Sequence, residues 1–309
     1  MTATTVPPAA PVPLANHAAD LALSHAYCLH LTRQAARNFY HGLKLLPLPK
    51  RQAMFAVYAW MRLVDDIADD VDQRTPAQRR TELSAWRTAT AQVYTGQTHG
   101  LDHPVWPAFA SAVREFGIPE HIFADMIAGQ IQDLDYQPFA TFKEVHHYCY
   151  RVASTAGLAS VYVWGFSGGE ATLQLAIDRG IAFQLTNILR DLREDAQRGR
   201  IYIPMNELEK YSVHPEAFAT TAAPWNVRSL LNYQVDRAMD YFRRSEGLEA
   251  RVSPDCRPAL LAMTMIYFGV LKRIRRDPAA VLTKRVRLPL LQKLWIAYRS
   301  TKMTQWHAD

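Results

Sequence analysis

The sequence has few of the residues that build β-rich or disulfide-rich proteins. Only 13 of its 309 residues are glycine and three are cysteine, and runs of alternating Val, Ile and Thr are scarce. These absences argue against an all-β fold, while long stretches rich in Ala, Leu, Arg and Glu favour helix. Three cysteines without a Cys-x-x-Cys pair indicate neither a disulfide framework nor a zinc site. We therefore expect an all-α protein in a reducing, cytoplasmic compartment.

Long apolar runs are missing as well. The longest, residues 258–271, is shorter than the roughly 20 residues that a bilayer span needs, so we expect no transmembrane anchor. Residues 1–20 are rich in Ala and Pro and lack the basic and apolar regions of a signal peptide. We expect a disordered tail there and a single domain over residues 21–309. The net charge of +6 comes from scattered arginines, so we expect no nucleic-acid partner.

Proline and capping signals divide the chain into helices. Thr75-Pro76 and Ser253-Pro254 each offer an N-cap followed by proline, and residues 141–144 resemble a capping box. No internal repeat or domain boundary is evident. The expected helices cover residues 22–40, 50–72, 77–95, 105–116, 119–132, 142–166, 171–196, 225–246, 255–275 and 288–303.

Two aspartate-rich segments are the most informative feature of the chain. Each contains two aspartates four residues apart, Asp65 and Asp69 in the first and Asp191 and Asp195 in the second. On a helix this spacing places both carboxylates on one face, where like charges cost about a few tenths of a kcal/mol. Mg²⁺ takes oxygens from one or two carboxylates and completes its shell with water and substrate phosphates. Two such pairs therefore predict a metal–diphosphate site.

Polar residues extend both acidic faces along their helices. At about 100° per residue, Tyr58 and Arg62 lie in line with the first pair. Gln184 and Asn187 lie in line with the second, with Arg190 beside them. A solvated helix face is the simpler interpretation of either segment alone, but two matching segments among apolar neighbours disfavour it.

Two other motifs are interpreted as structural. Asp133 and Asp135 form a third acidic cluster, which is typical of a helix C-terminus entering a loop before Pro138; a functional role is the alternative. The glycine cluster at residues 165–169 has no following Lys-Ser or Lys-Thr. We expect it to be a turn between helices and not a phosphate loop.

Several segments share their order and spacing with one enzyme family. They are Asn38-Phe39-Tyr40 with Leu45-Leu46-Pro47, Tyr58 to Arg62 before the first acidic pair, Tyr148 to Gly157, and Gln184 to Pro204 through the second pair. Over about residues 24–300 the chain resembles the squalene/phytoene synthase family, the head-to-head prenyl diphosphate synthases. The resemblance implies one all-α domain of the isoprenoid synthase type, with a central apolar cavity between antiparallel helices.

The resemblance also implies roles for individual residues. The Mg²⁺ ligands would be Asp65, Asp69, Asp191 and Asp195, with Asn187 assisting the second pair. The diphosphate-binding residues would be Asn38, Arg62, Tyr148, Gln184, Arg190, Tyr267 and Arg285. The catalytic set would be Phe39, Tyr58, Tyr148 and Arg62, with Phe39 and Tyr58 flanking the reacting carbocation, because an aromatic face stabilises positive charge.

Two of these positions carry a qualification, and two further positions bear on the substrate. The family often has Ser or Thr where this chain has Asn38, whose amide can still donate to a phosphate. Packing in the core is the alternative for Tyr267. Leu43 and Phe55 are expected on helix faces that line the cavity, where side-chain size would help to select C15 or C20 chains.

The implied reaction is a Mg²⁺-dependent condensation, with Mn²⁺ as the alternative metal. Loss of diphosphate from one prenyl donor gives an allylic cation, which the double bond of the second molecule attacks to form a cyclopropylcarbinyl diphosphate. A second ionisation leads to phytoene, dehydrosqualene or squalene, in carotenoid or triterpenoid and hopanoid biosynthesis. Only squalene requires NADPH, and no Gly-x-Gly-x-x-Gly follows an expected strand.

Rival functions remain beside this one. A head-to-tail prenyltransferase or a terpene cyclase would share the helices, the metal and the prenyl diphosphate substrates. A non-catalytic family member that serves as an assembly factor would be expected to lose acidic ligands, and this chain keeps all four. Farnesyl and geranylgeranyl diphosphate both stay candidate substrates, and the oligomeric state stays open.

The C-terminal segment from Lys284 interleaves cations with aromatic side chains. Its cations are Lys284, Arg285, Arg287, Lys293, Arg299 and Lys302, and its aromatics include Trp295, Tyr298 and Trp306. This composition is typical of interfacial helices, so peripheral membrane contact is a further expectation. Core packing of Trp295 is the alternative.

Overall fold

The computed structural model describes residues 14–35 and 42–308, with side chains from residue 19 onward. Within these ranges the chain is helical, and its only β-type pairing is an isolated bridge between Phe166 and Val252. The all-α prediction is confirmed. The predictions for Asn38 and Phe39 fall outside the described residues. Helix α1 (Leu14–Ala35) begins inside the segment expected to be a tail.

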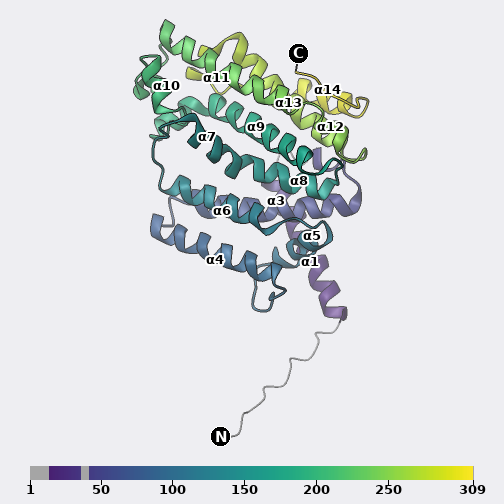
Figure 1. The fold of residues 1–309 in the computed structure, drawn as a ribbon. Coiled ribbons are helices and arrows are strands. Elements are labelled where there is room, and N and C mark those ends of the chain that lie inside the picture. The colour runs from purple at the N-terminus through teal and green to yellow at the C-terminus, as the bar shows by residue number, and fades with distance from the viewer. Residues whose placement is uncertain (1–13, 36–41, 309) are drawn as a thin grey trace.

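The helices stack in layers (Figure 1). In that view α4 lies at the bottom, α3 and α6 above it, then α7 and α8, then α9, with α11 and α13 at the top. The remaining α-helices after α1 are α3 (Leu48–Asp69), α4 (Pro76–Tyr94), α5 (Trp106–Glu115), α6 (Glu120–Leu134), α7 (Phe142–Cys149), α8 (Thr155–Trp164), α9 (Gly169–Gln197), α10 (Met205–Lys210), α11 (Trp225–Arg244), α12 (Leu248–Arg251), α13 (Arg257–Arg276) and α14 (Leu290–Ser300). The short elements are a π-helical turn, η1 (Tyr150–Ser154), and two 3₁₀ turns, η2 (Pro215–Ala219) and η3 (Pro278–Leu282).

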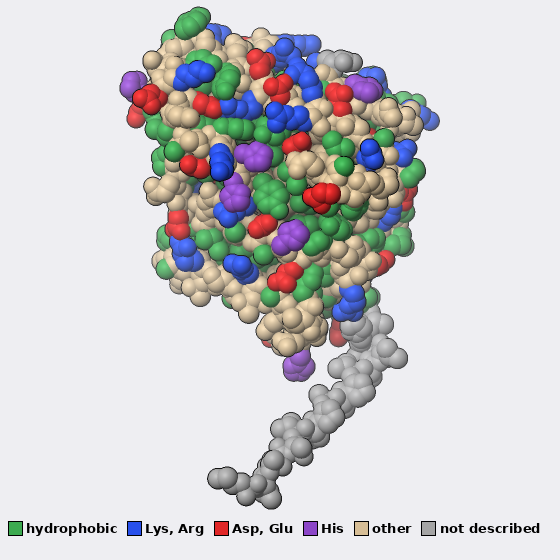
Figure 2. All heavy atoms as spheres, viewed as in Figure 1, with side chains coloured by type: hydrophobic (Ala, Val, Ile, Leu, Met, Phe, Trp, Pro, Cys, Tyr) green, Lys and Arg blue, Asp and Glu red, His purple; other side chains and the backbone are tan. Residues whose placement is uncertain are grey.

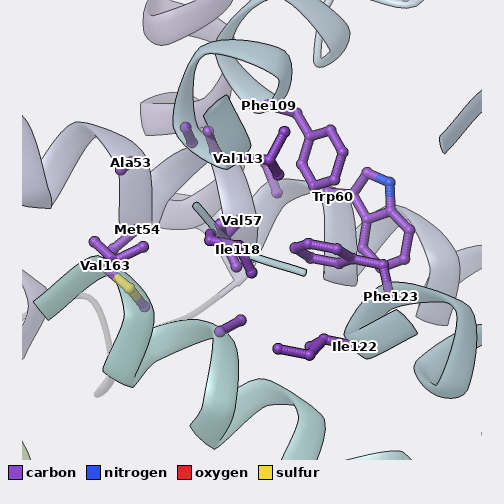
Figure 3. Close-up of a cluster of buried hydrophobic side chains, with 14 of the residues drawn as sticks. Ala53, Met54, Val57, Trp60, Phe109, Val113, Ile118, Ile122, Phe123 and Val163 are labelled. Carbon is purple, nitrogen blue, oxygen red and sulfur yellow. The ribbon is translucent and has the colours of Figure 1, made fainter. Parts of the chain in front are cut away.

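An aromatic cluster sets the rotation of α3 about its axis. Trp60 is fully buried and packs against Phe109 of α5 and Phe123 of α6, with ring centroids 5.4 and 4.8 Å away (Figure 3). Its indole Nε1 donates to Thr90 Oγ1 at 3.2 Å. Large buried aromatic side chains contribute strongly to core stability, so the apolar face of α3 is held inward here. The acidic face expected from the sequence consequently points away from this cluster.

The segment predicted as one helix over residues 142–166 is divided by the π-helical turn η1. There α9 approaches closely: a Cβ on Gly180 would come within 2.5 Å of the Ser154 Cα. Ser154 Oγ also donates to the carbonyl of Ile177 at 2.7 Å. Single π-turns often mark functional sites. This one changes the helical phase between Tyr148 and the residues of α8.

Local capping follows the prediction at one helix and departs from it at two. Thr75 and Gln78 form a reciprocal capping box at the start of α4. Thr141 makes no side-chain cap, because Glu144 Oε2 instead accepts from the backbone N–H of Ala140 at 2.7 Å. The N-cap predicted at Ser253 is wrong: α13 begins at Arg257, and the Ser253 backbone N–H pairs with the Gly165 carbonyl at 2.9 Å.

The glycine cluster forms a turn between α8 and α9, as predicted, with φ angles of 77° at Gly165 and 88° at Gly168. Charged side chains of both signs are interspersed among hydrophobic ones on the face shown in Figure 2, with no single basic field. Within the described part of the chain, no helix has the length and apolar character that a membrane crossing requires.

Candidate active site

The first acidic pair lies at the C-terminal end of α3. Asp65 is half-buried and accepts a hydrogen bond from Gln130 Nε2 of α6 at 2.6 Å. Burial, and then the neighbouring Asp69 carboxylate, raise the pKa of Asp65 to about 7. Arg62 forms its ion pair with Asp66 and not with Asp65. The pair is therefore a site where negative charge is under-compensated.

The second acidic pair lies near the end of α9. Burial, and then the Asp191 carboxylate, raise the pKa of Asp195 to about 6. Asp191 receives two guanidinium groups: Arg190 donates to its two oxygens at 2.8 and 2.6 Å, and Arg285 does so at 2.8 and 3.0 Å. Arg285 also reaches Glu194 at 3.2 Å. The structure thus joins the predicted residues Arg190, Arg285 and Asp191.

The oxygen donors of this region fit a hard divalent cation. Asn187 Oδ1 is buried and has no hydrogen-bond partner, while its Nδ2 lies 3.3 Å from Gln184 Oε1. An orphaned buried carbonyl oxygen is costly, and one turn further along α9 lies Asp191. Among the described residues, no three His, Cys, Asp or Glu side chains converge to hold a metal by themselves. Mg²⁺ is commonly bound by one or two carboxylates with phosphate and water, so the donor set fits a metal that arrives with a diphosphate.

Asp133 lies at the helix C-terminus expected for the third acidic cluster, and its carboxylate is also held by two tyrosine hydroxyl groups. It lies in the last turn of α6 and accepts hydrogen bonds from Tyr148 Oη at 2.8 Å and Tyr202 Oη at 3.1 Å. Burial raises its pKa, and these two hydroxyl groups oppose the rise. Its charge contributes to the raised pKa values of Asp65 and Asp195, so it lies near one carboxylate of each pair. Its neighbour Asp135 points elsewhere and pairs with Arg80.

A stack of tyrosines holds Asp133 in place. The rings of Tyr148 and Tyr202 are stacked with centroids 5.1 Å apart. Tyr136 Oη donates to the Ile201 carbonyl at 2.7 Å and accepts from the Ile201 N–H at the same distance, which fixes the backbone beside Tyr202. Arg200 Nη2 donates to the Asp133 carbonyl at 3.2 Å. Tyr148 is therefore a held polar group beside the carboxylates.

Gln130, Asp133 and Tyr202 contact the acidic pairs or their neighbours, although the sequence-based expectations give them no role in the site. Gln130 and Asp133 are three residues apart, which places both on one face of α6. Tyr202 stands in the segment that carried the family resemblance, yet no role was attached to it. The i, i+3 spacing of an amide and an aspartate near the end of α6 is the signal in the sequence for this pair.

Tyr267 packs in the interior and lies near Arg190. Its ring stacks on Phe183 with centroids 4.2 Å apart, which is a packing contact. Burial lowers the pKa of Arg190, but the hydrogen bonds to Asp191 and the nearby charges of Asp191 and Tyr267 raise it overall. The Tyr267 hydroxyl consequently lies beside the guanidinium that holds Asp191.

A cavity of about 750 Å³ lies between α1 and α3. Its lining includes Leu21, Leu29 and Phe55, with Lys44 and Arg51 among its polar residues. This volume is in the range of about 300–1,000 Å³ that ligand pockets occupy. Phe55 lies one helical turn before Tyr58, so the cavity adjoins the polar face of α3.

Leu43 is buried, with 1% of its surface exposed, but is not part of this lining. The side chain of Tyr58 is half-buried. Its burial raises the pKa of its hydroxyl group, and the charge of Arg62 opposes that rise. Tyr58 and Arg62 therefore lie on α3 between the cavity and the first acidic pair.

Comparison with known proteins identifies one family throughout. The family model described as squalene/phytoene synthase matches residues 32–292. The phytoene synthase of Mycobacterium tuberculosis is 39% identical over 272 residues, covering 86% of this chain and 87% of that protein. The phytoene synthase of Arthrospira platensis is 34% identical over 289 residues, covering 88% and 90%.

Solved structures agree with these sequence relatives. A dehydrosqualene synthase in complex with a ligand superposes with a TM-score of 0.81 at 26% identity, covering 94% of this chain and 98% of that one. The squalene synthase HpnC of Alicyclobacillus acidocaldarius superposes with a TM-score of 0.76 at 25% identity, covering 86% and 96%.

Proposed function

The chain belongs to the squalene/phytoene synthase family, and on that premise we propose that it condenses two molecules of geranylgeranyl diphosphate head to head, through a cyclopropylcarbinyl diphosphate, to phytoene. Membership makes it a prenyltransferase. The observation that carries the proposal is that Arg190 and Arg285 both bind the Asp191 carboxylate, while the charge of Asp133 acts on one aspartate of each pair. Farnesyl diphosphate, giving dehydrosqualene or squalene, is the second candidate.

The metal of this proposal is Mg²⁺, with Mn²⁺ as a substitute. Asp65 and Asp69 would hold it on α3, and Asn187, Asp191 and Asp195 on α9. Bound there, the ion would supply Lewis acidity toward the departing diphosphate. Its positive charge would also favour the ionised forms of Asp65 and Asp195, whose pKa values are raised in the free protein.

The two arginines that bind Asp191 are also suited to bind the phosphate oxygens of a diphosphate. Arg190 and Arg285 each offer two donors to the same carboxylate, and a planar guanidinium binds phosphate oxygens with the same fork geometry. If Asp191 turns to a metal, both groups become available to the diphosphate. Charge developing on the leaving diphosphate would then be stabilised by groups already in position.

The apolar part of the substrate would extend from the acidic face along α3. Tyr58 would present its ring to the cation, and the cavity beside Phe55 would receive hydrocarbon. Exclusion of water matters because an exposed allylic cation would be hydrolysed. Tyr148, held on Asp133 Oδ2 at 2.8 Å, would orient its hydroxyl dipole toward the reacting groups.

We propose phytoene as the product because of the names of the proteins most similar in sequence among those compared. Those at 34–39% identity are named phytoene synthases, whereas the structures named for dehydrosqualene and squalene synthesis are 25–26% identical. Phytoene formation ends with loss of a proton and consumes no NADPH. The chain would then act in carotenoid biosynthesis.

A product assay tests the proposal. Purified protein with Mg²⁺ is incubated with geranylgeranyl or farnesyl diphosphate, with and without NADPH, and the hydrocarbons are identified by mass. We expect a C40 hydrocarbon from geranylgeranyl diphosphate that does not depend on NADPH. An Asp191→Asn variant serves as the inactive control. Elongated diphosphates or cyclic terpenes as the main products would show that the reaction is of another type.

A further inference from the structure

Helix α14 presents an apolar face to solvent. The face consists of Leu290, Leu291, Leu294, Trp295 and Tyr298, whose exposed fractions are 66, 80, 58, 55 and 67%. Their spacing of i, i+1, i+4, i+5 and i+8 forms one continuous stripe on a helix. Ile296 and Ser300, on the opposite side, are buried. The core packing considered for Trp295 is therefore not what the structure shows.

The charged side chains of the segment that carries this stripe are all cationic. Between Asp277 and Asp309 the sequence has no acidic residue. Lys293 and Arg299 lie on either side of the stripe, and the Arg299 guanidinium is 5.1 Å from the centre of the Trp295 ring. Exposed cations before and after the helix are Lys284, Arg287 and Lys302.

The stripe is displayed on an anchored helix. Arg193 of α9 donates to the Thr283 carbonyl at 3.1 Å, and Arg273 of α13 donates to the Arg287 carbonyl at 2.9 Å. Leu288 is buried against Gly269, where an added Cβ would come within 3.0 Å of it. The same strap, residues 283–289, carries Arg285 to Asp191. The surface that leads into α14 is thus tied directly to the diphosphate end of the candidate site.

We propose that the exposed face of α14 docks on the surface of an anionic lipid bilayer. Leucine side chains would enter the boundary between headgroups and acyl chains, Trp295 and Tyr298 would lie at headgroup depth, and the flanking cations would contact lipid phosphates. A second copy of the chain fits this face less well, because pairing two α14 stripes would bring cations of the same sign together. Lipid binding of this kind does not depend on turnover.

Vesicle sedimentation with matched variants tests the docking surface. Full-length protein is mixed with vesicles of phosphatidylcholine alone, or of phosphatidylcholine with phosphatidylglycerol, at low and high salt. The test variant is Leu291→Ser/Trp295→Ser. Its matched control is Leu23→Ser/Trp225→Ser, which replaces one leucine and one tryptophan that are 71 and 82% exposed elsewhere. Helicity and thermal unfolding check that both variants fold.

We expect binding to the anionic vesicles that weakens with salt, a loss of about tenfold or more in partitioning for the α14 variant, and no loss for the control. Lys293→Gln/Lys302→Gln should reduce binding to anionic vesicles alone.

Equal binding of wild-type protein to both vesicle types, or no binding to either, overturns the proposal. A concentration-dependent dimer in light scattering that the α14 variant abolishes would assign the face to a second copy. Turnover assayed in detergent micelles should be unchanged in the α14 variant, which separates this proposal from the proposed reaction.

Discussion

Replacing Asp65 by asparagine should stabilise the metal-free protein while it abolishes turnover. The carboxyl has its pKa raised from 3.8 to about 7 by burial and by Asp69. Between these values the unfolded chain has released the proton and the folded chain retains it, so wild-type stability falls as pH rises through this window. An amide has no such titration. The advantage of Asp65→Asn should therefore be absent below pH 4, grow toward pH 7 and stay constant above it.

The expected gain in stability follows from the size of the pKa shift of Asp65. A rise of about three pKa units corresponds to at most about 4 kcal/mol, and solvent that reaches the half-buried side chain screens this to about 1–2 kcal/mol. For a protein of this size we expect an increase of roughly 2–5 °C in Tm at pH 8. The hydrogen bond from Gln130, 2.6 Å long, would survive, because the oxygen of the new amide can accept it.

The assay compares thermal unfolding of wild-type protein and Asp65→Asn in EDTA at pH 5 and pH 8. Asp66→Asn is the matched control, since Asp66 is paired with Arg62 and its neutralisation should give no gain. Adding Mg²⁺ with inorganic pyrophosphate should raise the Tm of the wild-type protein more than that of Asp65→Asn. A variant that is less stable than wild type at pH 8, or equally stabilised at both pH values, would refute the reasoning.

Three further predictions concern activity. EDTA should abolish product formation and Mg²⁺ should restore it, as measured by hydrocarbon yield; activity that survives complete chelation would contradict the metal assignment. Tyr148→Phe removes the hydroxyl that donates to Asp133 at 2.8 Å and should lower kcat about 10²-fold, the lower end of the range for a positioned polar group, with helicity unchanged; an unaltered kcat would confine Tyr148 to packing. Phe55→Ala, which enlarges the cavity that Phe55 lines, should favour use of C20 relative to C15 substrate in a competition assay, and an unchanged product ratio would exclude Phe55 from chain-length selection.

The helices and the acidic faces are properties of local sequence. Hydrophobic periodicity and the four-residue aspartate spacing act within a few helical turns, so α3 and α9 could be predicted with the aspartates of each pair on one face. Segment order and spacing, compared with a known family, then indicated the isoprenoid synthase fold.

Tertiary packing decided the features that depend on distant neighbours. Asp133 lies at a helix end, as its local sequence predicts, and only the approach of Tyr148 and Tyr202 from other segments supplies two hydroxyl donors to its carboxylate. The π-helical turn lies where Gly180 of α9 closely approaches Ser154, a contact that no local periodicity encodes. Likewise, the composition of α14 suggested an interface, but its packing against the protein through Ile296 determined which face remains exposed. Periodicity is a short-range property, whereas burial and charge at a site are set by side chains that only the fold brings together.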